Sequence, residues 1–351
     1  MKKIKDLYHK NIVINRVGRL GINIRNYPLQ DYEKSCSIRK ILDVWNCEKL
    51  SKDMKMYLED SSPDGALYGI LHWIKKYAGI SKKLNFYVEH GLYFGDLVRE
   101  NAVDSIYDGV ITFSKHRAKI INEKSDKRVF TIGPYIHYAD DYYGLEEFKK
   151  IKAKLGKTLL FFPPHSIKGH DAKYDISSIV TRLKEFKTEY NTIMVCMYYK
   201  DVQRGLHKEF ENEDFFVVTA GHFYDYNFLS RLKSIIKLSD HTASMAIGTH
   251  IGYCLQLDKS HEIINKDSSI TIPDDTNKLF SSIKESEIEN RGPNYLKTFT
   301  EDEETILNAF FNMGSIITIE QQKISDKYWG LSEIKSKLDL KKELLGNDDG
   351  Y

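Results

Sequence analysis

The sequence carries almost no net charge: 52 Lys and Arg are balanced by 50 Asp and Glu over 351 residues, a formal charge of +2. Such an even balance of charge excludes the broad basic surface with which proteins attract nucleic acid. No nucleic-acid partner is therefore expected. Lysine does cluster locally, around residues 2–5 and 75–83. These clusters leave two interpretations open, a solvated face and a peripheral contact with an anionic inner-membrane surface.

Long apolar runs are also missing. None approaches the length of about 18 residues that marks a membrane-spanning helix. The opening residues, Met-Lys-Lys-Ile-Lys-Asp, lack the apolar core of a signal peptide. These absences predict a cytoplasmic protein, either soluble or peripheral on the inner membrane face.

Cysteine is scarce, with only four residues that lie far apart. Cys196 and Cys254 stand in apolar runs, where a buried free thiol is the usual outcome. No group of Cys and His has the spacing of a metal site, and no Asp-x-Asp follows a predicted strand. The sequence therefore predicts that the protein binds no metal.

What the sequence does contain is an alternation of short apolar segments with helical patterns. The length of the chain exceeds that of one usual domain and fits two domains of about 150–180 residues each. Continuous apolar strands alternating with helices favour parallel sheets covered on both faces. The predicted strands are 84–89, 109–114, 128–132, 158–163, 192–198, 215–219, 234–238 and 262–264. The predicted fold class is α/β, with an N-terminal domain at 1–140, a second domain at 141–300, and a helical segment and tail at 301–351.

Residues that follow the strands are candidate site residues, because open parallel sheets bind ligands beyond the carboxyl ends of their strands. In the first half these are Glu89, His90 and Asp96. An imidazole titrates near neutral pH, so His90 is the candidate general base for an acceptor hydroxyl. Asp96 or Glu89 either orients the ring or acts as the base instead. The alternative is that His90 is a hydrogen-bonded turn residue.

In the second half, hydroxyl, imidazole and lysine side chains follow three more strands. A serine hydroxyl donates hydrogen bonds and a lysine supplies a mobile charge, so such groups suit phosphates or a ribose. The candidates here are His165, Ser166, Lys200, Thr219, Gly221 and His222.

The most informative stretch is residues 239–258, where a Gly-, Ser- and Thr-rich turn leads from predicted strand 234–238 into a helix through Ile251 and Leu255. The first N–H groups of a helix are unpaired and its dipole is positive there, so this turn is a candidate anion site. It has neither the Lys of a P-loop nor the three spaced glycines of a dinucleotide fold, which indicates a nucleotide-diphosphate site of another type. An ordinary strand-to-helix turn is the alternative. The candidate residues are Thr242, Ser244, Gly248, Thr249 and His250.

Several of these segments together resemble the two-Rossmann (GT-B) glycosyltransferases of bacterial surface-polysaccharide assembly, of the capsule, O-antigen and teichoic-acid types. The resemblance covers roughly residues 84–265. Where the family often has Lys-Pro after the donor helix, this chain has Lys259-Ser260, and Glu262 stands near the place of the family's donor-domain Glu. The matching segments are Glu89-His90-Gly91, Thr131 to Tyr135, Phe161 to Ser166, and Leu238 to Lys259.

The resemblance implies two Rossmann-like domains facing across a cleft. It implies an enzyme that moves a sugar from a nucleotide-activated donor to a hydroxyl of a growing surface glycan, the acceptor being lipid-linked or an oligosaccharide of capsule or lipopolysaccharide type. Such enzymes generally need neither metal nor cofactor, because side chains and a helix N-terminus neutralise the leaving diphosphate.

Three alternatives remain open at the level of sequence. One keeps the fold but takes a CMP-activated acidic sugar, of sialic acid or Kdo type, or a CDP-activated polyol phosphate. Another is a UDP-sugar 2-epimerase-like enzyme. The last is a non-catalytic protein that binds sugar nucleotides or glycans.

Overall fold

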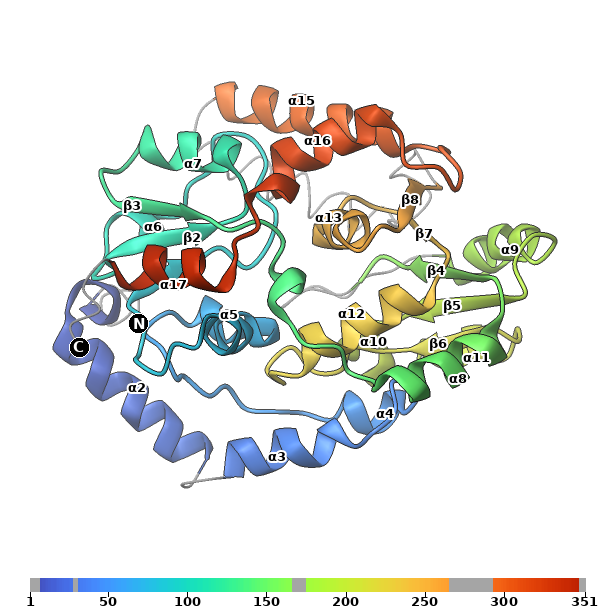
Figure 1. Cartoon of the computed structure of the whole chain (residues 1–351), viewed down its shortest axis with the longest axis horizontal. Coiled ribbons are helices and arrows are strands. Elements are labelled where there is room, and N and C mark those ends of the chain that lie inside the picture. Colours follow the sequence, from blue (N-terminus) through green and yellow to red (C-terminus); the bar gives the residue numbers. More distant parts are fainter. Residues whose placement is uncertain (1–6, 28–30, 166–174, 265–292, 347–351) are drawn as a thin grey trace.

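The computed structural model describes residues 7–27, 31–165, 175–264 and 293–346, with the backbone alone at 293–300. Its strands form two separate parallel sheets (Figure 1). The smaller has the order β1–β2–β3, from Phe86–Val88, Gly109–Thr112 and Arg128–Thr131. The larger has the order β6–β5–β4–β7–β8, and its strands in chain order are Thr158–Phe162, Thr192–Cys196, Phe216–Val218, His241–Ser244 and Ser260–Ile263. The predicted α/β class and parallel sheets are confirmed.

Strand β4 shows why these segments become central strands. Leu159, Leu160 and Phe161 are all completely buried, so both faces of the strand are covered. A strand covered on both faces reads as a continuous apolar run, and such a run is visible in the sequence. Seven of the eight predicted strands coincide with observed ones.

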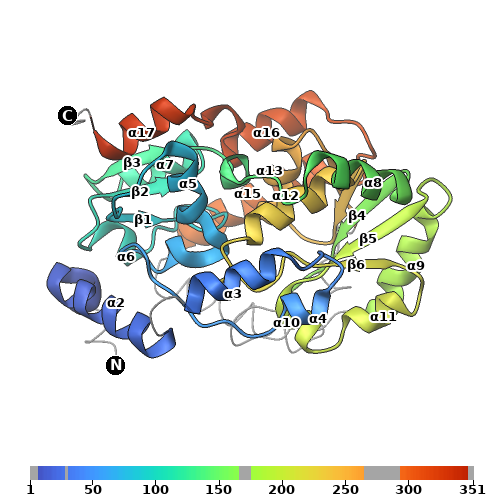
Figure 2. The same cartoon turned by 60° about the horizontal axis from the view of Figure 1, so that its bottom comes forward.

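Helices flank both sheets (Figures 1 and 2). A 3-10 turn, η2 (Tyr135–Tyr138), leads the chain from the smaller sheet toward the larger one. The helices of the first part are η1 (Asp64–Gly69), α5 (Ile70–Ala78), α6 (Glu100–Val103) and α7 (Lys115–Asn122). Those of the second part are α8 (Leu145–Leu155), α9 (Ile176–Phe186), α10 (Tyr199–Gln203), α11 (His207–Glu211), α12 (Phe228–Leu238) and α13 (Thr249–Gln256).

The predicted strand 234–238 is wrong. These residues end helix α12, and the strand comes afterwards, as β7. Leu229, Leu232, Ile235 and Ile236 are buried at helical spacing, so the short apolar run is one face of a helix. Periodicity alone does not separate a short buried helix segment from a buried strand.

At both ends of the chain, segments contact the half of the protein to which the predicted domain boundaries do not assign them. Helix α3 (Asp31–Lys40) contacts the loop before α12, where Asn227 Nδ2 donates to Cys36 O at 3.1 Å, and α4 (Cys47–Leu50) packs against α10. Between these two helices, Val44 O accepts a hydrogen bond from Thr219 N at 3.0 Å, directly after β6. At the other end, α15 (Pro293–Phe310) and α16 (Ile319–Trp329) are followed by η4 (Leu331–Glu333) and α17 (Lys337–Leu345). Helix α17 lies against α5, beside the smaller sheet (Figure 1). The division at 140 and 300 stays a prediction.

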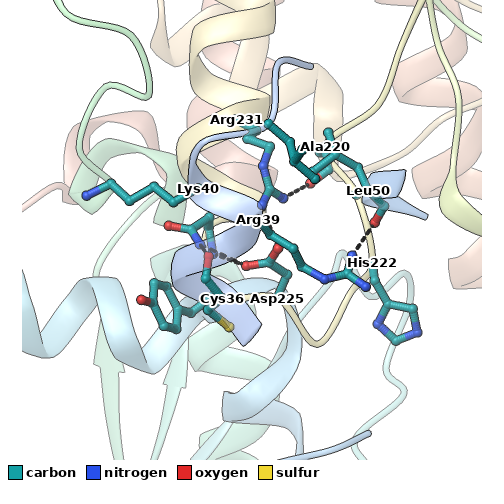
Figure 3. Close-up of polar contacts among 12 residues, drawn as sticks. Cys36, Arg39, Lys40, Leu50, Ala220, His222, Asp225 and Arg231 are labelled. Atoms are coloured by element: carbon teal, nitrogen blue, oxygen red, sulfur yellow. Dashed lines mark hydrogen bonds and ion pairs between the residues drawn. The ribbon is translucent and has the colours of Figure 1, made fainter. Parts of the chain in front are cut away.

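A buried polar cluster holds the N-terminal segment on the larger sheet (Figure 3). Asp225 and Arg231 form an ion pair at 2.5 Å whose side chains are both completely buried. Arg39 donates to Leu50 O at 2.7 Å, and Arg231 donates to Ala220 O at 2.7 Å. Gly221 has φ +88, and a Cβ there would lie 2.8 Å from Arg231 Nη1, so the close approach needs glycine. The loop after β6 is thereby tied to residues 39–50.

No helix in the described ranges is both long enough and apolar enough to cross a membrane.

Candidate active site

His90 directly follows β1, and its partner is Asp64 of η1. The two atoms His90 Nδ1 and Asp64 Oδ1 are 3.6 Å apart, and the His90 side chain is 24 % exposed. Asp64 also accepts a hydrogen bond from Tyr87 Oη at 2.9 Å and lies 3.7 Å from Arg99. Burial would raise the pKa of Asp64, but hydrogen bonding and the charge of His90, with help from Tyr87 and Arg99, lower it below its usual value. Asp64 therefore stays ionised beside the imidazole, at ion-pair rather than hydrogen-bond distance from Nδ1.

The two carboxylates predicted to assist His90 are engaged elsewhere. Glu89 is buried, and it accepts hydrogen bonds from Arg117 Nε at 2.9 Å and Nη2 at 2.6 Å and from Thr112 Oγ1 at 2.7 Å. This ion pair ties β1 to β2 and α7. Asp96 is half exposed and pairs with Lys124 at 3.1 Å. The carboxylate that lies beside His90 is therefore Asp64, which the sequence analysis did not single out.

The loop that carries His90 contacts the N-terminus of α13. Leu92 N donates to Thr249 Oγ1 at 3.3 Å, and a Cβ on Gly91 would lie 3.7 Å from the same oxygen. Gly95 N donates to Asp302 Oδ2 at 2.8 Å, which fixes the far end of the loop on α15. A candidate base and a helix N-terminus from different sheets are thus neighbours.

The N-terminus of α13 is where the sequence predicts it, with the helix running through Ile251 and Leu255. Gly248 is its N-cap and, because glycine has no side chain, no side chain at that position caps the helix. The ring of His250 stacks on Phe162 with 4.7 Å between centroids. Burial, and after it the charge of His165, lowers the pKa of His250 to about 3, so this imidazole is neutral.

Gly252 serves packing rather than ligand access. A Cβ at this position would lie 2.1 Å from Trp329 Cγ. Helix α13 can therefore press against α16 only because residue 252 has no side chain.

Rings connect the two sheets at the carboxyl ends of their strands. The rings of His90 and Tyr68 are 6.4 Å apart, those of His165 and Tyr198 are 4.9 Å apart, and the Tyr68 and Tyr198 hydroxyls interact. Burial raises the pKa of both tyrosines, so both stay protonated. His165 follows β4 and Tyr198 follows β5, so residues after strands of both sheets do meet. Ser166 lies outside the described residues.

The predicted cluster after β6 has a different set of neighbours. Thr219 Oγ1 donates to Met197 O at 2.8 Å, and His222 N donates to Leu50 O at 3.1 Å. Burial first, then the positive charge of Arg39, lowers the pKa of His222 to about 4, and half-buried Lys200 adds to this effect. With Gly221 against Arg231, the contacts of this cluster tie it to the N-terminal segment.

Thr242, Ser244 and Glu262 do not lie in the turn before α13, because the first two are inside β7 and the third is inside β8. Thr242 Oγ1 donates to Ser260 O at 2.8 Å, and Ser244 Oγ donates to Ala246 O at 2.8 Å. Glu262 pairs with His241 at 3.0 Å. The expectation that Thr242 and Ser244 line the turn is wrong, and its cause is the misplaced strand.

In the described part of the chain, no group of three or more His, Cys, Asp or Glu side chains is arranged to hold a metal ion. The prediction of metal-independent chemistry is not tested by this.

Comparisons with known proteins give limited guidance. No protein-family model and no curated protein matches the chain. Solved structures of the wall teichoic acid polymerase TagF are similar to it: one is 14 % identical, with 94 % of this chain and 93 % of that chain covered and a TM-score of 0.38. A TagF structure with CDPG soaked in is 13 % identical, with 94 % and 95 % covered and a TM-score of 0.40. TM-scores of this size do not establish a shared fold, so the function of this chain is argued from its own geometry.

Replacing Asp64 with Asn should destabilise the protein at neutral pH by roughly 1–3 kcal/mol, the usual worth of hydrogen bonds to a charged group. A carboxyl whose pKa is lowered in the folded state stabilises the fold above its unfolded pKa of about 4, and this contribution fades as the pH falls through the folded pKa. Urea unfolding of wild type and Asp64→Asn over that acidic range should show the difference shrink. Asp96→Asn, at an exposed ion pair, is the control and should change little. A difference for Asp64→Asn that does not vary with pH would contradict the assignment.

Proposed function

We propose that this protein is a transferase of the GT-B glycosyltransferase type, which moves a nucleotide-activated sugar to a hydroxyl of a surface glycan. The observation that carries the proposal is the contact between the His90 loop and the N-terminus of α13, made by Leu92 and Thr249. It makes the loop of the candidate base a neighbour of the candidate anion site, and the two come from different sheets. Acid–base chemistry on one substrate and phosphate binding on another need such an arrangement.

In the proposed reaction, His90 accepts the proton of the acceptor hydroxyl while the oxygen attacks the anomeric carbon of the donor. The bond between that carbon and the donor phosphate oxygen breaks, and the nucleotide leaves with the bonding electrons. Asp64 stabilises the imidazolium that forms, since its carboxylate is held ionised beside Nδ1. The partly exposed ring then returns the proton to solvent.

Helix α13 supplies the electrostatic part of the proposal. Its first N–H groups and the positive end of its dipole face the leaving phosphate, and neutral His250 adds no charge of its own. The donor is a nucleotide-activated sugar, and the acceptor is lipid-linked or an oligosaccharide. No cofactor takes part in the proposed reaction.

Nucleotide binding tests the anion site. A thermal-shift titration with UDP-, GDP-, CDP- and CMP-compounds should raise the melting temperature with one nucleotide class, and Gly248→Val should weaken that stabilisation. A Cβ at Gly248 would lie 2.7 Å from His250 Nδ1, so the variant displaces the ring at the helix start. Gly144→Val is the matched control, because Gly144 caps α8 and a Cβ there meets nothing within 4 Å. Stabilisation by none of the nucleotides would favour a binding protein for another ligand, and equal losses in both variants would place the site elsewhere.

The base is tested by kinetics with the donor so identified. His90→Ala should lower turnover by about 10²–10⁴-fold, the usual effect of losing a general base, while donor affinity stays nearly unchanged. Asp64→Asn should lower turnover less, because the base is still present but poorly oriented. Asp96→Asn, with its side chain at the surface, should behave as wild type. If Asp96→Asn is inactive while His90→Ala keeps its activity, the base is Asp96 and His90 is structural.

A further inference from the structure

Helix α2 (Ile12–Asn26) is inverted in polarity: its asparagines and Arg19 face the protein. Asn23 donates to Leu58 O at 2.9 Å and accepts from Leu58 N at 2.8 Å. Asn26 donates to Met56 O at 2.9 Å, and buried Arg19 donates to Glu59 O at 3.3 Å. Hydrogen bonds of this kind hold the helix along residues 55–59, at the edge of the molecule (Figures 1 and 2).

The outer face of α2 is apolar. Val13, Val17, Leu20 and Ile24 are 64, 65, 60 and 65 % exposed, and their spacing of four, three and four residues places them on one stripe. A helix on the surface of a soluble protein normally turns such a stripe inward. Isolated exposed apolar residues are common, but a contiguous stripe of four marks a surface that is covered in use.

The charges around this stripe identify what covers it. Helix α2 contains three arginines and no acidic residue, and the first 26 residues hold seven Lys or Arg against a single Asp. Arg16 is exposed and lies one helical turn from both Val13 and Leu20, so it flanks the stripe. An apolar stripe bordered by arginine fits the interface of an anionic bilayer, where the side chains enter the acyl boundary and the cations meet lipid phosphates.

A cavity beside α2 fits the same surface. It has a volume of about 450 Å³ and lies between α2 and residues 57–61 and 83–85. Arg16, Arg19 and Lys83 line it, with Glu59 as its acidic member. Three cations against one carboxylate leave a net positive site next to the apolar stripe, suited to a phosphate headgroup.

We propose that α2 docks on an anionic lipid bilayer, with Val13, Val17, Leu20 and Ile24 in the membrane interface and a lipid phosphate at the cavity of Arg16, Arg19 and Lys83. A second copy of the chain fits this surface less well, because a symmetric contact would bring two helices of the same positive charge together. The proposal is independent of the transferase activity and of the residues around His90.

Co-sedimentation of the full chain with vesicles tests this. Vesicles in which part of the phosphatidylcholine is replaced by phosphatidylglycerol should bind the protein, pure phosphatidylcholine vesicles should bind it more weakly, and added salt should weaken the first kind of binding. Val17→Gln with Leu20→Gln should lower binding by roughly tenfold or more, since burying one such side chain is worth about that factor. Arg16→Gln with Lys83→Gln, at two exposed cations of the cavity, should remove most of the preference for phosphatidylglycerol.

Ile316→Gln with Ile319→Gln is the matched control, because these side chains are 74 and 71 % exposed on the segment before α16 and at its start. This pair should bind vesicles as wild type does, and circular dichroism should show all variants folded. Three outcomes would overturn the proposal: wild-type protein that stays in the supernatant, equal loss in the control pair, or unchanged vesicle binding by Val17→Gln with Leu20→Gln. A dimer in light scattering that this α2 pair dissociates, without vesicle binding by wild type, would assign the surface to a second copy instead.

Discussion

The ion pair between Asp225 and Arg231 fixes the loop against which the segment with Asp64, the carboxylate beside His90, is placed. Both side chains are completely buried, and further hydrogen bonds offset part of the cost of taking such a pair out of water. Asp225 also accepts from Asn227 N at 2.9 Å, and Arg231 donates to Ala220 O. The loop between β6 and α12 is therefore held at several points, and two distant segments of the chain pack against it.

One of these segments carries the partner of His90. Tyr68 N donates to Phe223 O at 2.7 Å, and Trp73 Nε1 donates to Tyr226 O at 2.6 Å. Between them, Gly69 has φ +73 and approaches the Tyr226 backbone so closely that a Cβ would lie 2.2 Å from its carbonyl oxygen. These contacts fix the place of η1, which begins at Asp64. A loop of the larger sheet thus determines where the Asp64 carboxylate lies relative to His90, the candidate base beside the smaller sheet.

The sequence predicts the parts of this arrangement that are local. The strand before His90 and the helix after Gly248 are visible as apolar patterns, and the strand-end rule brings His90, His165 and Thr249 into consideration. Asp64 is missed because it contacts His90 across 26 positions of sequence. The chain after Asp64 also takes a left-handed turn at Tyr68 (φ 60), which no periodicity in the sequence signals. Thr242 and Ser244 are misplaced for the opposite reason, since a helical run of Ile and Leu has the same composition as a buried strand. Glu89 and Asp64 are both carboxylates, and only their burial and their partners show that Glu89 is paired with Arg117 while Asp64 lies beside His90.

Hydrogen–deuterium exchange of the full chain, with and without the nucleotide that stabilises it, tests the central claim most directly. A site formed where the His90 loop meets α13 predicts slower exchange on binding at residues 248–253 and 89–95, in segments that belong to different sheets. Protection confined to other segments, for example beside the cavity under α2, with no change at the start of α13, would contradict the account.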